Sequence, residues 1–300
     1  MGRLRRMKVI GEEAYYHLIS RTVGGEFYLG DVEKEKLQSI IMSFSKLYFV
    51  QVLGFCIMDN HFHLLIKSET EDKYSDEEVL SRLESFYPDK KEVLKYNLSY
   101  YRKKLSDISE YMKSIKLTFS RWYNKVNDRK GYFWGDRFKS VLVESGNALL
   151  NTLAYIDLNP IRAGIVEKPE DYRWSSIGYR VGTGNKGDFL SFEGIFDKAD
   201  KDSIKRYREL VYRAGVLNKD NLSSIDLEEL EKESDRNFEL SVSELCKHRV
   251  RYFTDGAVIG SKEFVMNAYA AFGDIIIRKK ERKAHKTGIT DGLFSLRHLR

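Results

Sequence analysis

Apolar residues recur along the first half of the chain with two periods, one typical of strands and one typical of helices. Three short runs rich in aromatic and β-branched residues predict β-strands, at 14–20, 49–57 and 62–67. Between the first two, an apolar residue returns every three or four positions over 32–48, which predicts a helix with one buried face and Asp31 as a candidate N-cap. The second and third runs are separated so tightly that they predict an antiparallel hairpin.

The next hundred residues continue this alternation of helix and strand. Residues 68–106 are dense in charge and contain a proline, so we expect one or two exposed helices there. Apolar residues at helical spacing over 107–126 are interleaved with lysine and arginine, which predicts a helix with a basic flank. A strand is predicted at 137–143 and a helix at 147–158, ended by a proline. Elements in this order predict an α+β domain with helices packed on an antiparallel sheet.

The remainder of the chain has a different, mainly helical pattern. Residues 182–188, rich in glycine, are the best candidate for a linker between a domain of residues 1–181 and an extension of residues 189–300. Charged amphipathic segments predict helices in the extension, at 201–214, at 224–235 and on both sides of a turn at Asp255-Gly256 within 241–272. Two helices joined by a short turn are compatible with a helix-turn-helix motif, and a small helical packing domain is the alternative.

Charge is distributed unevenly along a chain of ordinary composition. The 300 residues are 42% hydrophobic with only three prolines, so the chain can bury a core. Lysine and arginine number 51 against 45 aspartates and glutamates, a net charge of +6. The first ten residues hold Arg3, Arg5, Arg6 and Lys8 with no acid, and residues 278–300 hold eight basic residues against two acidic ones. Two basic ends around a slightly acidic body favour a polyanionic partner, such as a nucleic acid.

Some classes of protein are disfavoured by what the sequence lacks. No apolar run approaches the roughly 20 residues that span a bilayer, and no apolar segment follows the N-terminal charges as in a secretory signal. Cys56 and Cys246 lie far apart without a Cys-x-x-Cys pattern, which argues against a disulfide framework or a zinc knuckle. We therefore expect a soluble cytoplasmic protein with no membrane partner.

The sharpest chemical feature is the pair His61 and His63 on the third predicted strand. Alternate side chains of a strand face the same way, so both imidazoles lie on one face while Phe62 lies on the core face. Two imidazoles so placed form half of a metal site, although such pairs also occur in cores as ordinary hydrogen-bonding residues. Leu65 disfavours the metallo-hydrolase pattern His-x-His-x-Asp, and we expect His17 on the first strand to be structural.

Tyr155 and Asn159 form a second candidate constellation. Residues four apart share a face of a helix, so a tyrosine nucleophile and a metal-binding carbonyl oxygen could point into one pocket. Pro160 follows directly, which could move Asn159 out of the helix. The chain has 19 tyrosines, so spacing alone does not distinguish Tyr155 from core or surface tyrosines.

Short motifs occur in a consistent order across residues 1–180. They are His17-Leu18-Ile19-Ser20-Arg21; Gly54 with Met58-Asp59-Asn60-His61-Phe62-His63-Leu64-Leu65; residues 131–140 (GYFWGDRFKS); residues 155–164 (YIDLNPIRAG); and Trp174-Ser175-Ser176. Together they resemble the IS200-like single-tyrosine transposases, and within them they are most similar to the REP-associated tyrosine transposases. Relative to compact members of that family, residues 68–106 resemble an enlarged insertion.

The resemblance implies a ferredoxin-like antiparallel sheet and a metal-dependent site. It assigns the family's HUH metal-binding pair to His61 and His63, and the catalytic nucleophile to Tyr155. Asn159 lies where the insertion-sequence branch has a metal-binding glutamine and the REP-associated branch commonly has asparagine, so it is the candidate third ligand. The implied cofactor is a divalent metal, Mg²⁺ or Mn²⁺.

The implied reaction is cleavage and rejoining of single-stranded DNA at palindromic hairpins through a 5′-phosphotyrosine. The implied partner is single-stranded or hairpin DNA, bound by a monomer or a homodimer. Basic residues of the N-terminal arm and beside the motifs are candidates for DNA contacts: Arg3, Arg5, Arg6, Lys8, Arg21, Arg137, Lys139 and Arg162. Two alternatives stay open, a non-catalytic protein that binds DNA hairpins and an HUH replication or mobilisation endonuclease.

Overall fold

The structure of the chain is a computed structural model. It describes residues 6–90, 94, 96–185, 187–196, 202–216, 251–272, 283–287 and 292–296. Arg3, Arg5, the predicted helix 224–235 and the first part of the segment 241–272 lie outside the described residues. Within the described residues, no helix combines the length and the apolar composition needed to cross a membrane.

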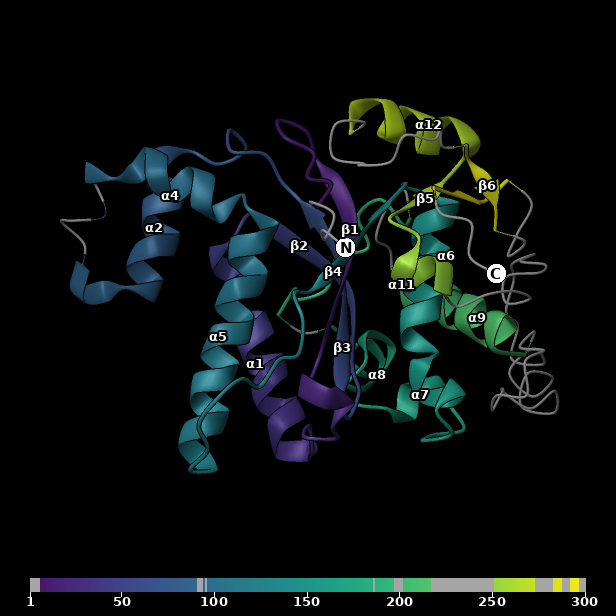
Figure 1. Cartoon of the computed structure of the whole chain (residues 1–300), viewed down its shortest axis with the longest axis horizontal. Helices are drawn as coiled ribbons and strands as arrows, with labels where there is room; N and C mark the ends of the chain where they lie inside the picture. The colour runs from purple at the N-terminus through teal and green to yellow at the C-terminus, as the bar shows by residue number, and fades with distance from the viewer. Residues whose placement is uncertain are drawn as a thin grey trace.

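A four-stranded antiparallel sheet forms the centre of the molecule (Figure 1). Its strands are β1 (Ala14–Arg21), β2 (Val50–Ile57), β3 (His61–Ser68) and β4 (Lys139–Val143), in the order β2-β3-β1-β4. β1 pairs antiparallel with both β3 and β4, and β2 pairs antiparallel with β3. With a long helix between β1 and β2 and another between β3 and β4, this is the ferredoxin-like arrangement, so the expected α+β fold is confirmed.

Two long helices cover one face of the sheet, α1 (Asp31–Leu47) and α5 (Ile108–Val126) (Figure 1). The N-cap of α1 is Gly30, so Asp31 stands in the first turn, where its negative charge is favourable to the helix dipole. Asp107 caps α5 by accepting a hydrogen bond of 2.6 Å from the Ser109 amide. The apolar stripes predicted from the sequence are buried, including Leu37, Ile41, Met112, Ile115 and Phe119.

The insertion between β3 and α5 forms α2 (Asp76–Phe86), the 3₁₀ turn η2 (Pro88–Lys90) and α4 (Leu98–Leu105). These elements lie on the outer side of α1 and α5 (Figure 1). Ser75 and Glu78 form a capping box at the start of α2. Val79 and Leu83 of α2 are fully buried, so the insertion packs onto the domain through one apolar face.

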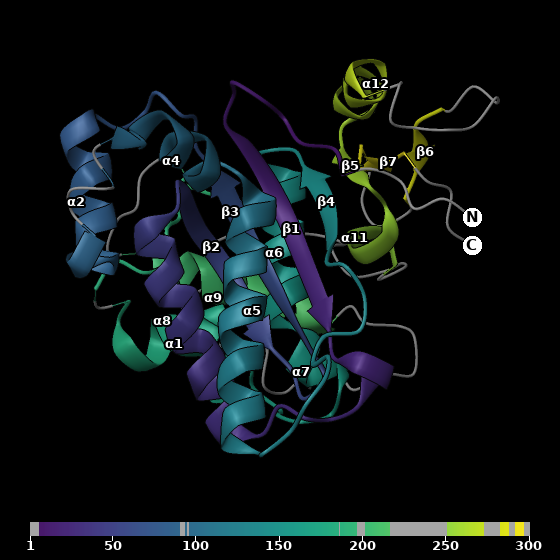
Figure 2. The same cartoon turned by 60° about the vertical axis from the view of Figure 1, so that its left-hand side comes forward.

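The opposite face of the sheet carries α6 (Asn147–Asp157), the short helix α7 (Asn159–Arg162), α8 (Ser176–Thr183) and α9 (Ser203–Val216) (Figures 1 and 2). The 3₁₀ turn η3 (Pro169–Asp171) lies between α7 and α8, and another, η1 (Val23–Gly25), lies between β1 and α1. α6 lies close against β2 because Gly54 has no side chain. A Cβ atom at Gly54 would be 2.1 Å from Leu153 Cδ1 of α6.

The end of α6 is fixed by a buried carboxyl group. Asp157 accepts hydrogen bonds from the Ser176 hydroxyl at 2.7 Å and from the Ile177 amide at 3.2 Å, both at the start of α8. The Tyr207 hydroxyl of α9 donates to the other carboxyl oxygen. α6, α8 and α9 are therefore joined at one buried point, two residues beyond Tyr155.

Three short strands continue the sheet beyond β4, namely β5 (Val258–Gly260), β7 (Phe294–Ser295) and β6 (His285–Lys286). β5 pairs in parallel with β4, and α11 (Arg251–Asp255) and α12 (Lys262–Ala271) flank it in sequence. The sequence pattern predicts only a turn between two helices here. A run of three residues is too short for its strand character to appear in a periodicity, so β5 was not predicted.

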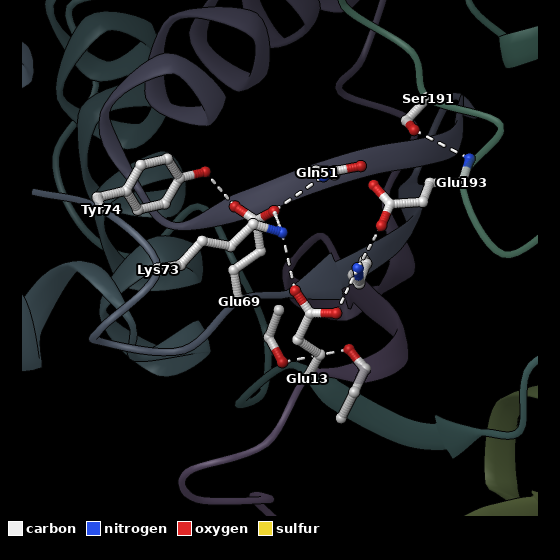
Figure 3. Close-up of polar contacts among 10 residues, drawn as sticks. Glu13, Gln51, Glu69, Lys73, Tyr74, Ser191 and Glu193 are labelled. Carbon is white, nitrogen blue, oxygen red and sulfur yellow. Dashed lines mark hydrogen bonds and ion pairs between the residues drawn. The ribbon is translucent and has the colours of Figure 1, made fainter. Parts of the chain in front are cut away.

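A network of ion pairs fixes residues 189–196 to the end of the sheet where β1 begins and β3 ends (Figure 3). Lys67 Nζ lies 2.5 Å from carboxylate oxygens of both Glu13 and Glu193. Lys73 Nζ pairs with Glu13 at 2.8 Å and with the buried Glu69 at 2.7 Å. Residues directly after the predicted linker are therefore packed against the sheet, and the buried side chains of Phe189 and Leu190 belong to its core.

Candidate active site

A pocket of about 750 Å³ lies at the opposite end of the sheet, where β1 ends and β3 begins. Its lining includes His61 and His63 of β3, Tyr155 of α6 and Asn159 of α7. The four candidate metal-binding and catalytic residues, which come from two distant segments of the sequence, therefore meet in one pocket.

The two histidines lie on the face of the sheet that α6 covers. Strand pairing places His61 opposite Arg21 and His63 opposite Ile19 of β1. The centroids of the two imidazole rings are 4.9 Å apart, with the ring planes at 80°. Phe62 points to the other face, where its ring centroid is 5.2 Å from that of Trp134. The predicted alternation of side chains is therefore present.

Hydrogen bonding fixes the protonation of the His61 ring. Asn60 Nδ2 donates to the Gly25 carbonyl at 2.9 Å, which orients the amide so that Asn60 Oδ1 faces His61 Nδ1 at 2.7 Å. A carbonyl oxygen only accepts, so His61 Nδ1 carries the proton and Nε2 carries the lone pair. Burial, with a smaller contribution from Arg21, lowers the pKa of His61 to about 4, which keeps the ring neutral at pH 7.

His63 is fully buried between the sheet and α6. Its Nδ1 lies 2.9 Å from Nε2 of His17, and among the described residues its Nε2 has no hydrogen-bond partner. Burial lowers the pKa of His63 well below its ordinary value, with the neighbouring His61 acting in the same direction. A neutral buried imidazole with an unpartnered nitrogen is in the form that binds a metal ion.

Asn159 begins α7, directly after the end of α6. Its Nδ2 donates to the carbonyl oxygens of Tyr155 at 2.9 Å and Ile156 at 3.1 Å. These bonds hold the amide group back against α6 even though Pro160 follows. Because both bonds use the amide nitrogen, Oδ1 is the atom that Asn159 can offer to a metal ion.

The pocket lining contains three atoms of the kinds that bind divalent cations, namely Nε2 of His61, Nε2 of His63 and Oδ1 of Asn159. Within the described ranges, no cluster of three or more histidine, cysteine, aspartate or glutamate side chains could hold a metal ion. A metal ion held by the two histidines would therefore take the amide oxygen of Asn159 as a third protein ligand. The mixed set of nitrogen and oxygen donors suits Mn²⁺ better than Mg²⁺, because imidazole favours transition metals.

The Tyr155 side chain is 4% exposed and is enclosed by rings. It stacks on Phe253 of α11, with centroids 4.9 Å apart and planes 14° from parallel. The ring of His63 meets it edge-on at 5.8 Å. Burial raises the pKa of Tyr155 to about 12, and the positive charge of Arg162 acts in the opposite direction. The hydroxyl is therefore protonated at pH 7, and its reaction as a nucleophile requires loss of that proton.

The candidate DNA-binding residues fall into groups. Arg21, Arg137 and Lys139 line the pocket itself, and Lys139 Nζ is 2.6 Å from Asp255. Arg162 lies against Tyr155. Lys8 lies outside the pocket lining and pairs with Asp107 at 2.7 Å, at the start of α5.

A second groove of about 590 Å³ runs between α5 and residues 131–138. Arg137 lines both this groove and the pocket. Arg6 lines the groove as well, with its guanidinium carbon 3.7 Å from the centroid of the Phe138 ring. Further basic and aromatic residues of its lining are Lys113, Lys116, Arg121, Tyr132, Phe133 and Trp134. The cations suit phosphates, and the exposed ring of Tyr132 suits an unpaired base, whereas Phe133 and Trp134 are buried.

Sequence reasoning missed the contribution of the C-terminal segment to the pocket. Thr254 and Asp255 line it, and Phe253 covers Tyr155. Their positions depend on the pairing of β5 with β4, and no local pattern in the sequence signals that pairing.

The family model of the IS200-like transposases matches residues 11–84, a segment that contains β1, α1, β2 and β3 with both histidines. The similarity thus covers three strands of the central sheet and the histidine pair, and Tyr155 lies outside the matched segment. No curated protein matches the chain.

Two solved structures are similar to this chain. A REP-associated tyrosine transposase bound to a REP hairpin is 14% identical, with a TM-score of 0.43 over 67% of this chain and 98% of the other. A candidate transposase of Deinococcus radiodurans R1 is 14% identical, with a TM-score of 0.28 over 47% of this chain and 87% of the other.

Proposed function

We propose that the protein is a DNA strand transferase that cleaves and rejoins single-stranded DNA at the hairpins of palindromic, REP-type repeats. The reaction proceeds through a 5′-phosphotyrosine on Tyr155 and depends on a divalent metal ion. The observation that carries this proposal is the pocket in which His61, His63, Tyr155 and Asn159 meet. A protein that only bound DNA would have no chemical use for a tyrosine beside two imidazole lone pairs. The similarity of residues 11–84 to the IS200-like transposases supports the same class of reaction.

The proposed chemistry exchanges one phosphodiester bond for another. The Tyr155 hydroxyl oxygen attacks the scissile phosphorus and loses its proton, while the bond from phosphorus to the 3′ oxygen breaks and that oxygen takes up a proton. The 3′-hydroxyl of another strand then attacks the phosphotyrosine and releases Tyr155. The number of phosphodiester bonds is unchanged, so ATP is not required. A divalent cation held by His61, His63 and Asn159 would polarise the scissile phosphate and orient it for in-line attack.

The surroundings of the pocket support a role in holding DNA. Arg21, Arg137 and Lys139 supply positive charge at its rim, where the phosphates on either side of the scissile bond would lie. The groove that shares Arg137 offers aromatic surface to unpaired bases, and Tyr132 within it is 86% exposed. A strand could therefore pass from the pocket into the groove over Arg137.

One observation favours a second candidate function, a protein that binds hairpin DNA without cleaving it. Tyr155 is 4% exposed, and Phe253 covers one side of its ring. A tyrosine that stays enclosed in this way would not reach a phosphate. The formation of a covalent adduct distinguishes the two functions.

The proposed function is tested with a labelled single-stranded hairpin of a palindromic repeat and Mn²⁺. The variants His61→Ala and His63→Ala are expected to cleave at least about 100-fold more slowly, because each loses a metal ligand, and to bind the hairpin within a few-fold of the unaltered protein. His285→Ala is the control, since His285 lies in β6 outside the lining of the pocket. Cleavage at the same rate by the two pocket variants would exclude the metal site.

A further inference from the structure

We infer that His17 is a positioning residue of the metal site, held by the main chain of the C-terminal segment 251–260, and that it keeps the Nε2 lone pair of His63 directed at the metal. The inference rests on the proposed metal-dependent function. It assigns a role to two parts of the chain, a β1 histidine and a segment beyond the tyrosine helix, that provide no ligand themselves.

His17 forms a hydrogen bond with the main chain of Phe253. His17 Nδ1 lies 2.8 Å from the carbonyl oxygen of Phe253. A main-chain carbonyl cannot donate, so His17 Nδ1 must carry a proton. The His17 ring is 0% exposed and Phe253 is buried, so water does not compete for this bond. Among the described residues, the hydrogen bonds of His17 go to a carbonyl oxygen and to a second imidazole, and a fully buried ring without a carboxylate partner is neutral.

The proton on His17 Nδ1 determines the state of the other nitrogen of the ring. A neutral imidazole that is protonated on Nδ1 has a lone pair on Nε2, so His17 Nε2 accepts in the 2.9 Å hydrogen bond with His63 Nδ1. His63 Nδ1 is then the donor, and His63 Nε2 has the lone pair. The Nε2 atom of His63 has no hydrogen-bond partner among the described residues and belongs to a side chain that lines the pocket. Second-shell partners of metal-binding histidines commonly fix the ring in this way.

Contacts with β4 and with Tyr155 hold the Phe253 carbonyl in position. The segment is joined to the edge of β4 by two main-chain hydrogen bonds, from the Leu142 amide to the Ala257 carbonyl at 2.9 Å and from the Glu144 amide to the Ile259 carbonyl at 3.0 Å. The Ser261 hydroxyl donates to the Glu144 carboxylate at 2.9 Å. The stacking of Phe253 on Tyr155 holds the other end.

This chain of contacts explains why a buried polar residue stands on β1 beneath the tyrosine helix. His17 is 0% exposed and uses both ring nitrogens, one on the C-terminal segment and one on a metal ligand. Without the Phe253 carbonyl, His17 could equally carry its proton on Nε2, and His63 would then have to place its own proton on the nitrogen that faces the pocket. The segment 251–260 is thus a part of the metal site.

The direct test is ¹⁵N NMR of histidine side chains in the full-length protein without metal, with His63 assigned by comparison with His63→Ala. The inference predicts that His63 and His17 are both protonated on Nδ1 and unprotonated on Nε2. A His63 ring with its proton on Nε2 would overturn it. This measurement needs neither DNA nor catalysis.

Binding of Mn²⁺, followed by the EPR signal of the free ion, gives the functional arm. His17→Leu removes the acceptor for His63 and is expected to weaken Mn²⁺ binding about 10- to 100-fold. His17→Gln can still place an acceptor oxygen near the position of Nε2, so it is expected to restore most of the affinity. Thermal unfolding and hairpin binding without metal are the controls for folding.

The two proposals fail in different ways. Unchanged Mn²⁺ affinity in folded His17→Leu, or no Mn²⁺ binding by the unaltered protein, would overturn the role of His17. Mn²⁺ binding that follows the predicted order, together with no cleavage of any hairpin, would support the role of His17 and overturn the proposed strand transfer.

Discussion

The guanidinium carbon of Arg162 lies 4.9 Å from the centroid of the Tyr155 ring, and Arg162 Nη1 donates a hydrogen bond of 2.8 Å to the Tyr155 carbonyl oxygen. One side chain therefore contacts both the main chain and the ring of the proposed nucleophile. Its positive charge lowers the pKa of Tyr155, against the larger effect of burial, which raises that pKa to about 12. Arg162 is thus placed to make the tyrosinate easier to form.

Arg162→Gln is expected to shift the pH dependence of cleavage. With the positive charge removed, the pKa of Tyr155 rises, so the rate of adduct formation falls at any pH below that pKa, by about tenfold for each pKa unit. Rates measured between pH 7 and 10 should therefore reach a given value only at a higher pH. Arg162→Lys keeps the charge and should retain most of the original profile. A profile that is unchanged in Arg162→Gln would show that the charge does not act on Tyr155.

Gly54→Ala is expected to displace the helix that carries Tyr155. The added Cβ would be 2.1 Å from Leu153 Cδ1 and 3.0 Å from the Ser176 hydroxyl, and both side chains are buried. Overpacking of this kind costs about 1–3 kcal/mol of stability, measured by urea unfolding. Adduct formation should fall more than hairpin binding, because α6 moves relative to β3. Gly182→Ala is the control, since a Cβ on this exposed α8 glycine meets no described atom within 4 Å.

Asp157 is expected to make stability depend on pH in the acid range. Burial raises its folded pKa from 3.8 to about 6, so the protonated carboxyl is favoured in the folded protein. The resulting stabilisation is fully present below pH 3.8 and is lost as the pH rises through about 6, a change on the order of 3 kcal/mol. Asp157→Asn cannot titrate. The free energy of unfolding of the unaltered protein, relative to this variant, should therefore fall between pH 4 and 7, and a constant difference would contradict the shift.

Elements with long patterns could be predicted from the sequence. The helix over Ile108–Val126 repeats its apolar spacing for five turns, and the histidine pair shares a face of β3 because any strand alternates. The position of Tyr155 on a helix also followed from spacing. Spacing did not distinguish Tyr155 from the other tyrosines among the 19 in the chain, and that choice depended on resemblance to a family.

The rest of the site could not be predicted, because it depends on contacts between distant residues. His17 reaches His63 only through the register of β1 against β3, and hydrophobic alternation does not fix the register between two buried strands. Phe253 reaches both His17 and Tyr155 through β5, whose three residues carry no periodicity. The ion pair between Lys8 and Asp107 also could not be predicted, because the sequence shows only a basic N-terminal arm.

The central claim is that Tyr155 becomes covalently attached to the 5′ phosphate of a cleaved DNA strand. It is tested most directly by incubating the protein with a single-stranded REP-type hairpin and Mn²⁺, digesting the product, and locating the phosphonucleotide by mass spectrometry. The account predicts a 5′-phosphotyrosine on residue 155, and no adduct with Tyr155→Phe, which should still bind the hairpin. An adduct on another residue, or one that persists in Tyr155→Phe, would contradict it.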